Sequence, residues 1–165
     1  MRFLDDQIRE FESKNDPTTP KTRWGLRPLT FFDLQSIEKE AGSPPLRGLH
    51  LYLAASKPLD DSQDDPDNPP SDEVKQERLR TYLAKLSELS ADEQVAVEQA
   101  REYLVRYNYA VCCRGVATID GRAVDRDQCA SMLSRMRPSE VFAAVVADVS
   151  NKIRDLDAGE AEKKG

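Results

Sequence analysis

Apolar residues recur at intervals of three and four over most of the chain beyond residue 72, and this periodicity restricts the fold more than any other feature. Side chains spaced in this way share one face of an α-helix. We predict four helices: one at about residues 72–88, one at about 91–114, one opened by Asp125 and one begun by Pro138. The predicted apolar stripes are Leu79, Tyr82, Leu83 and Leu86; Ala96, Ala100, Tyr103, Leu104, Tyr107 and Val111; Cys129, Met132, Leu133 and Met136; and Val141, Phe142, Val145, Val146, Val149 and Ile153. Because these stripes must be buried against one another, they predict a C-terminal helical bundle over residues 73–156.

Polar capping residues mark where three of these helices begin. Such a residue accepts a hydrogen bond from the backbone of the first helical turn, and the side chain of an acid or amide three residues later accepts one from the backbone N–H of the capping residue. The predicted caps are Ser71, the pair Ser90 and Glu93, and the pair Asp125 and Gln128. Between the second and third helices, residues 119–122 predict a turn in which Gly121 adopts a positive φ.

The first 56 residues predict a smaller N-terminal α subdomain that carries a short extended segment. Its first element is predicted from Leu4, Ile8 and Phe11, which are spaced as one apolar stripe on a helix. We therefore expect a helix at about residues 2–14.

Residues 21–29 predict an extended segment or a short edge strand. Pro28 lacks a backbone N–H and cannot complete the hydrogen bonds of a central strand. Thr30 then predicts the cap of a helix at about residues 31–41. A further helix is expected at about residues 49–55, where apolar residues predominate.

Residues 57–72 separate the two halves and contain four prolines and six aspartates. Such a composition cannot bury enough apolar surface to offset the entropy of ordering, so we predict a loosely ordered linker. A calcium-binding loop is excluded, because Asp65 stands where that loop needs glycine and Ser71 where it needs glutamate. The predicted organisation is thus residues 1–56, the linker 57–72, the bundle 73–156 and a polar tail 157–165.

The formal net charge is −6, and it is distributed unevenly. Residues 57–73 hold one lysine and seven acids, which account for the whole imbalance. Neither remaining part has the basic excess that binding to phosphate backbones requires, so we expect no nucleic-acid partner. One cluster of arginines could form a local patch, although a solvated helix surface is the simpler interpretation. Its members are Arg101, Arg106, Arg114, Arg122 and Arg126.

No apolar run approaches the roughly 20 residues needed to cross a bilayer, so we expect no membrane association. The N-terminal residues alternate apolar and charged side chains and lack the apolar centre of a signal peptide. We therefore expect a cytoplasmic protein. Cys112, Cys113 and Cys129 are an odd number of cysteines, which does not suit a secreted disulfide framework. We interpret them as buried, reduced thiols.

The sequence contains no recognisable catalytic motif and predicts a non-enzymatic protein without a cofactor. With His50 as the single histidine, and with adjacent cysteines that point to different sides of a helix, a metal site is not expected. Carboxylates at Asp120 and Asp125 are assigned to a turn and a helix cap rather than to acid–base chemistry. Tyr109 falls outside the apolar stripe of its helix, and exposed tyrosines are enriched at interfaces, so it is the predicted partner-binding residue.

Two stretches of the chain together resemble a known family. The first runs from Trp24 to Asp33 and contains Arg27-Pro28-Leu29-Thr30, followed by an acid-bearing helix. The second runs over residues 107–153: an apolar helix, Thr118-Ile119-Asp120-Gly121-Arg122, Asp125-Arg126-Asp127, a short helix, Arg137-Pro138-Ser139 and a closing helix. This order is similar to that of the tail assembly chaperones of long-tailed bacteriophages, in which an "R-x-L-T" strand supports a domain that ends in an "x-D-G-x" turn and two helices.

The resemblance implies a protein that binds the long, apolar helices of the tape-measure protein in the host cell cytoplasm. Such chaperones keep those helices soluble and help to bring tail-tube subunits to them, and they leave before the virion is complete. The acidic linker and the adjacent cysteines depart from the family's pattern. Two alternatives remain at this stage: a structural virion subunit of the baseplate or connector, and a small enzyme or regulator with an unfamiliar site.

Overall fold

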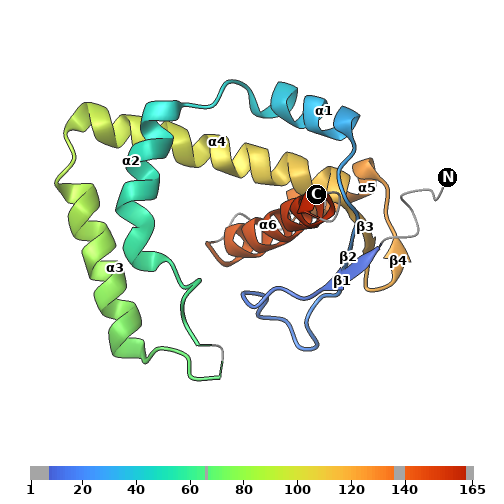
Figure 1. Cartoon of the computed structure of the whole chain (residues 1–165), viewed down its shortest axis with the longest axis horizontal. Coiled ribbons are helices and arrows are strands. Elements are labelled where there is room, and N and C mark those ends of the chain that lie inside the picture. The colour runs from blue at the N-terminus through green and yellow to red at the C-terminus, as the bar shows by residue number, and fades with distance from the viewer. Residues whose placement is uncertain (1–7, 66, 136–139, 163–165) are drawn as a thin grey trace. The chain divides into compact units, whose positions relative to one another are not determined.

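The computed structural model describes residues 8–65, 67–135 and 140–162 (Figure 1). This part of the chain is mainly helical, as predicted, with six α-helices and a small four-stranded antiparallel sheet. Contacts divide the chain into two compact units. The sheet unit comprises Met1–Gly42 and Leu104–Gly165, and the insert unit comprises Ser43–Tyr103. The acidic segment 57–72 lies inside the insert unit, and the domain limits given above stay a prediction.

The sheet has the order β1-β2-β3-β4, with every neighbouring pair antiparallel. Its strands are β1 (Arg9–Phe11), β2 (Trp24–Leu26), β3 (Val116–Ile119) and β4 (Arg122–Ala123). Two of them therefore come from the N-terminal part of the chain and two from the C-terminal part. A helix at residues 2–14 was the wrong prediction for residues 9–11, because pairing with β2 satisfies the backbone of this segment. Leu4 lies outside the described residues.

Strand β2 is an interior strand, and the prediction of an edge strand was wrong. Trp24, Gly25 and Leu26 are all buried, and they pair with β1 on one side and β3 on the other. Pro28 follows the strand and so removes no hydrogen bond from it. A Cβ atom on Gly25 would lie 1.9 Å from Oγ1 of Thr118, its cross-strand partner, so the close approach of these two strands requires glycine.

A tight turn joins β3 to β4, as the sequence predicted. Asp120 and Gly121 both have positive φ, at 50° and 77°, which is the pattern of a type I′ hairpin turn. The Asp120 amide donates to the Arg23 carbonyl at 2.8 Å, and the Arg23 amide donates to the Asp120 carboxylate at 2.9 Å. This exchange fixes the hairpin to the residue that precedes β2.

Two helices of the sheet unit begin at the predicted caps. Helix α1 (Phe31–Ala41) opens with a capping box between Thr30 and Asp33, and α5 (Arg126–Arg135) opens with one between Asp125 and Gln128. Helix α4 (Ala91–Gly115) contributes its C-terminal part to this unit. The valine-rich segment is α6 (Glu140–Glu162), a helix as its spacing indicated. Pro138, the predicted start of this helix, lies outside the described residues.

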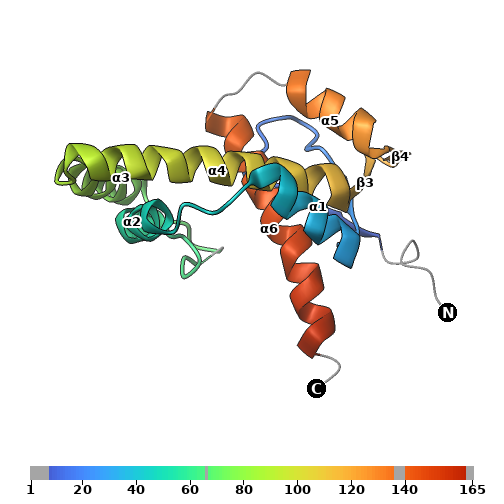
Figure 2. The same cartoon turned by 90° about the horizontal axis from the view of Figure 1, so that it is seen from above.

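The hydrophobic core of the sheet unit forms where these helices meet the sheet. Its completely buried side chains include Leu26 from β2, Val111 from α4, and Val149 and Ile153 from α6. Leu26 and Ile153 are 0% exposed, so β2 and α6, which lie far apart in sequence, share one core. Figure 2 shows α6 crossing the C-terminal part of α4. The apolar stripe predicted for the last helix is confirmed for its described members.

The insert unit consists of helices α2 (Leu46–Ser56) and α3 (Asp72–Ser87), the 3₁₀-helix η2 (Lys57–Leu59) and the N-terminal part of α4. Gly48 of α2 lies close against the backbone of Ala96 in α4. Helix α3 contains no buried residue, and its main contacts are with η2 and α2. Leu79 and Leu83 are exposed, so their predicted burial was wrong: the helix has too few packing partners to cover both sides.

The acidic segment before α3 is held by an ion pair. Arg78 donates through both terminal nitrogens to the carboxylate of Asp64, each at 2.7 Å. Side chains also organise the local turns, since the Asp60 carboxylate accepts from the Ser62 amide at 2.9 Å. This part of the predicted loosely ordered linker therefore has defined contacts.

Candidate functional site

A pocket of about 360 Å³ lies in the sheet unit, between α1, the C-terminal end of α4, β3 and the start of α5. Three arginines line it: Arg27, Arg114 and Arg126. Phe32 and Cys113 also form part of its wall. Figure 2 shows the helices concerned, with α1 and α5 beside the C-terminal end of α4. Arg114 and Arg126 come from α4 and α5, and Arg27 comes from the segment between β2 and α1, so the fold assembles this wall from distant parts of the sequence.

Glu40 of α1 joins two of these arginines. Arg114 donates to both carboxylate oxygens of Glu40, at 3.1 and 2.6 Å, and also to the Ala110 carbonyl at 3.0 Å. Arg126 binds the same carboxylate. The hydrogen bond from Arg114 is the main reason why the pKa of Glu40 is lowered; burial acts in the opposite direction, and the charges of both arginines add to the lowering. The arrangement ties α1, α4 and α5 together.

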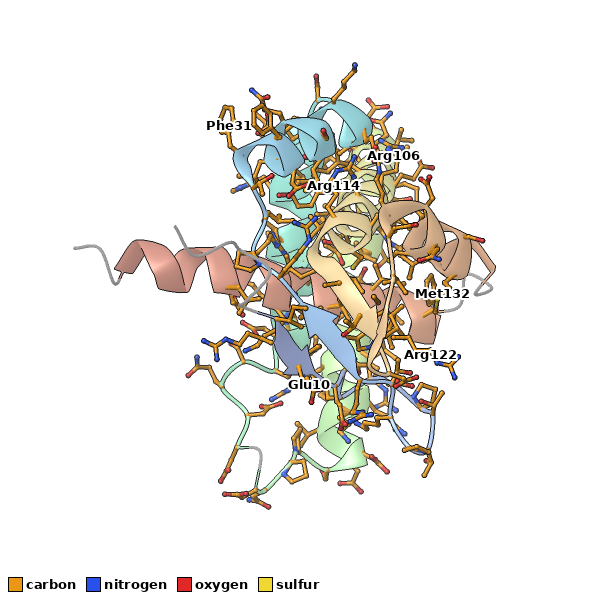
Figure 3. All side chains as sticks on the ribbon, turned by 90° about the vertical axis from the view of Figure 1, so that its right-hand side faces the viewer. Glu10, Phe31, Arg106, Arg114, Arg122 and Met132 are labelled. Atoms are coloured by element: carbon orange, nitrogen blue, oxygen red, sulfur yellow. The ribbon has the colours of Figure 1, made fainter. Side chains whose placement is uncertain are left out.

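Arg114 corrects the interpretation of the arginine cluster as a solvated surface. Its side chain is buried, with 4% exposed, whereas Arg106 and Arg122 are exposed (Figure 3). Arg101 belongs to the insert unit and pairs with Glu98 at 3.4 Å. The structure thus brings two of the five predicted arginines together, and it does so around a carboxylate.

Two exposed phenylalanines stand beside the pocket, at the first turn of α1. Phe31 is 68% exposed and Phe32 is 76% exposed, and their rings meet edge to face with centroids 5.9 Å apart. Leu34, on the same turn, is 40% exposed. Figure 3 shows Phe31 at the outer side of α1, pointing away from the ribbon. We call Phe31, Phe32 and Leu34 the α1 apolar surface. Contiguous apolar groups of this kind mark interaction sites more often than scattered ones do.

The α1 apolar surface was missed by the sequence reasoning, although a signal was present. Ile37 and Ala41, four residues apart, are the buried residues of α1. Phe32 precedes Ile37 by five residues, and this spacing places it off the buried face of the helix. Glu40 was missed because nothing in its local sequence indicates that Arg114 will lie beside it.

Tyr109, the predicted partner-binding residue, is half-buried rather than exposed. Its hydroxyl donates to the Ala130 carbonyl at 2.9 Å and so joins α4 to α5. Burial is the main reason why the pKa of Tyr109 is raised. A role in binding a partner stays a prediction for this residue. His50 is exposed on α2, and Asp120 and Asp125 make the turn and cap contacts described above.

The three cysteines are buried and reduced, as predicted. Cys112 lies against the Val146 carbonyl at 3.4 Å, and burial is the main reason why its pKa is raised. Cys129 donates to the Cys112 carbonyl at 3.7 Å. In the part of the chain that the structure describes, no three His, Cys, Asp or Glu side chains are grouped so that they could hold a metal ion.

Comparison with known proteins finds no matching family model, no similar curated protein and no similar solved structure. Among residues 8–65, 67–135 and 140–162, no helix has both the length and the apolar character that spanning a bilayer requires.

Proposed function

We propose that this chain is a non-enzymatic tail assembly chaperone of a long-tailed bacteriophage, which binds the tape-measure protein and helps to recruit tail-tube subunits in the host cytoplasm. The observation that carries the proposal is the meeting of the two stretches that resemble that family. Residues 24–33 and 107–153 are separated in sequence by the whole insert unit, yet both belong to the sheet unit.

The contacts between these stretches are specific. Trp24 of the first stretch pairs with Ile119 of the second within the sheet. The Arg27 amide, at the start of the "R-x-L-T" motif, donates to the Gly115 carbonyl at 2.8 Å. The elements on which the resemblance rests therefore lie together in space: a strand beside a hairpin, followed in the chain by two helices.

The α1 apolar surface supplies a binding face that suits this function. An amphipathic helix docks by laying apolar side chains against an apolar surface. Aromatic side chains and arginines are the residues enriched at the centres of such interfaces. Phe31 and Phe32 provide the aromatic part, and Arg27 and Arg126 border the adjoining pocket. Because a tape-measure protein presents long apolar helices, these residues form the contact face in the proposal.

Coexpression with the tape-measure protein of the same phage tests the proposal. We expect the tape-measure protein to be soluble and to copurify with this chain, and to aggregate when it is expressed alone. Mass spectrometry of purified virions should lack this chain, because a chaperone leaves before assembly is complete. An insoluble tape-measure protein in both cultures would contradict the proposal. Detection of the chain in virions would instead indicate a structural baseplate or connector subunit.

A further inference from the structure

We propose that Cys113 and Cys129 are an oxidative modification site, at which a hydroperoxide forms a disulfide between α4 and α5. This inference is independent of the proposed function. It rests on the contacts between the two helices, on the hydrogen bonding of the thiols and on the position of Cys113 in the pocket wall.

One face of α4 packs directly against the middle of α5. The Tyr109 hydroxyl donates to the Ala130 carbonyl at 2.9 Å, and the Cys129 thiol donates to the Cys112 carbonyl at 3.7 Å. Tyr109 and Cys113 are four residues apart and so lie on the same side of α4. Cys113 follows Cys112 and lies one turn beyond Tyr109, so these two contacts place it beside Cys129.

A hydrogen bond between the two thiols shifts their pKa values in opposite directions. It is the main reason why the pKa of Cys113 is lowered, and the Arg114 charge and the Tyr109 hydroxyl lower it further, while burial and the Glu40 charge oppose them. The same bond is the main reason why the pKa of Cys129 is raised. The directions of these shifts favour Cys113 over Cys129 as the thiol that ionises and attacks an oxidant.

Access from solvent also distinguishes Cys113. Cys113 lines the pocket between α1, α4 and α5 and is 5% exposed, whereas Cys129 is 0% exposed. A small oxidant such as hydrogen peroxide reaches Cys113 through the pocket. Cys129, behind it, then acts as the resolving thiol.

The reaction balances with one peroxide. The Cys113 sulfur attacks a peroxide oxygen, the O–O bond breaks, and the departing hydroxide takes a proton to become water, which leaves Cys113 as a sulfenic acid. The Cys129 thiol loses its proton, its sulfur attacks the Cys113 sulfur, and the S–O bond breaks to release a second water. Two thiols are oxidised by two electrons in total, and the peroxide is reduced by two.

Peptide mapping of the peroxide-treated full-length protein tests the proposal. The protein is incubated with hydrogen peroxide, denatured, alkylated and digested without reductant. We expect two of the three thiols to escape alkylation, a peptide pair linked through Cys113 and Cys129, and recovery of all three thiols after dithiothreitol. Alkylation of all three thiols, or a link between Cys112 and Cys113, would overturn the proposal.

Three serine variants assign the roles. Cys112→Ser is the matched control and should still form the link. Cys129→Ser should stop at the sulfenic acid, which dimedone traps on Cys113. Cys113→Ser should form neither product. Equal dimedone labelling of Cys113→Ser and Cys129→Ser would contradict the assignment of Cys113 as the attacking thiol. If a variant does not fold, as judged by circular dichroism, the peptide map of the natural sequence decides alone.

Discussion

The guanidinium of Arg114, buried near the end of α4, donates to both carboxylate oxygens of Glu40 on α1. Arg114 is 4% exposed, whereas the side chain of Glu40 is 41% exposed, so the cation is the more deeply buried partner. A guanidinium and a carboxylate in this bidentate geometry form one of the strongest polar contacts in proteins. This contact fixes α1 against α4 and, with it, the position from which Phe31 and Phe32 project.

Removal of Glu40 should therefore be costly. Glu40→Ala leaves the buried charge of Arg114 without its carboxylate, and we expect a loss of about 1–3 kcal/mol in the free energy of unfolding, a range that allows for the partial exposure of Glu40. Urea unfolding at pH 7 measures it. Arg126→Ala is the matched control. Arg126 binds the same carboxylate from an exposed position, so its removal should lower the free energy of unfolding by less than about 0.5 kcal/mol. Equal costs for the two variants would show that burial of Arg114 is not the cause.

Asp16 should make the stability of the sheet unit depend on acid pH. Its buried carboxylate accepts hydrogen bonds from Thr18 N and Oγ1, at 2.9 and 2.7 Å, and from Thr22 N at 2.8 Å. Burial is the largest single influence and raises its pKa, but these hydrogen bonds together outweigh it and lower the pKa from 3.8 to about 2. The folded-state pKa is thus below the unfolded one, so the stabilisation is present above pH 3.8 and is lost as the pH falls toward 2.

The variant Asp16→Asn should lose about 2 kcal/mol of unfolding free energy at neutral pH. The difference from the natural sequence should shrink as the pH is lowered from 5 to 3, because the Asp16 carboxylate of the unfolded chain then takes up protons while that of the folded protein stays largely ionised. Urea unfolding at several pH values in this range measures the difference. Asp127→Asn, at an exposed position of α5, is the control and should change stability by less than about 0.5 kcal/mol. A difference that does not depend on pH would contradict the assignment.

The helices could be predicted from the sequence because their signals are local. A capping box such as Ser90 with Glu93 involves residues three positions apart, and the structure contains both of its hydrogen bonds, at 2.9 and 3.3 Å. The stripe of α6 repeats over several turns, which separates it from the period of a strand. Each signal can be recognised without knowledge of the rest of the fold.

The sheet and the candidate site could not be predicted, because they depend on contacts between distant residues. Strand β1 has only three residues, and the spacing of Ile8 and Phe11 fits a helical stripe. Its pairing with β2 decides the conformation. Glu40 and Arg114 meet only after α1 and α4 have packed, so neither residue carries a local sign of the contact. Tyr109 was singled out by its place off the apolar stripe, but α5 covers part of that face.

The close approach of β2 and β3 at Gly25 can be tested by a double-mutant cycle. Gly25→Ala places a Cβ atom 1.9 Å from Thr118 Oγ1 and 3.1 Å from Thr118 Cβ, so we expect a loss of about 1–3 kcal/mol. Thr118→Ala removes the nearer atom, and in that background the cost of Gly25→Ala should fall by about 1 kcal/mol. Urea unfolding of the two single variants and the double variant gives the coupling energy. Additive costs would show that the two side chains do not compete for this space.

The α1 apolar surface should affect binding without affecting folding. Phe31 and Phe32 are 68% and 76% exposed, so the double variant Phe31→Ser with Phe32→Ser should change the unfolding free energy by less than about 0.5 kcal/mol. If these rings contact the tape-measure protein, the affinity of the double variant for that protein should fall at least about tenfold, equivalent to about 1.4 kcal/mol of binding free energy. Isothermal titration with a purified tape-measure segment measures the change. Leu46→Ser, which removes an apolar side chain that is 73% exposed on α2, is the matched control and should leave the affinity unchanged. Equal affinities for the natural sequence and the double variant would exclude this surface as the contact face. An equal loss of affinity in Leu46→Ser would indicate nonspecific binding to exposed apolar groups rather than a site on α1.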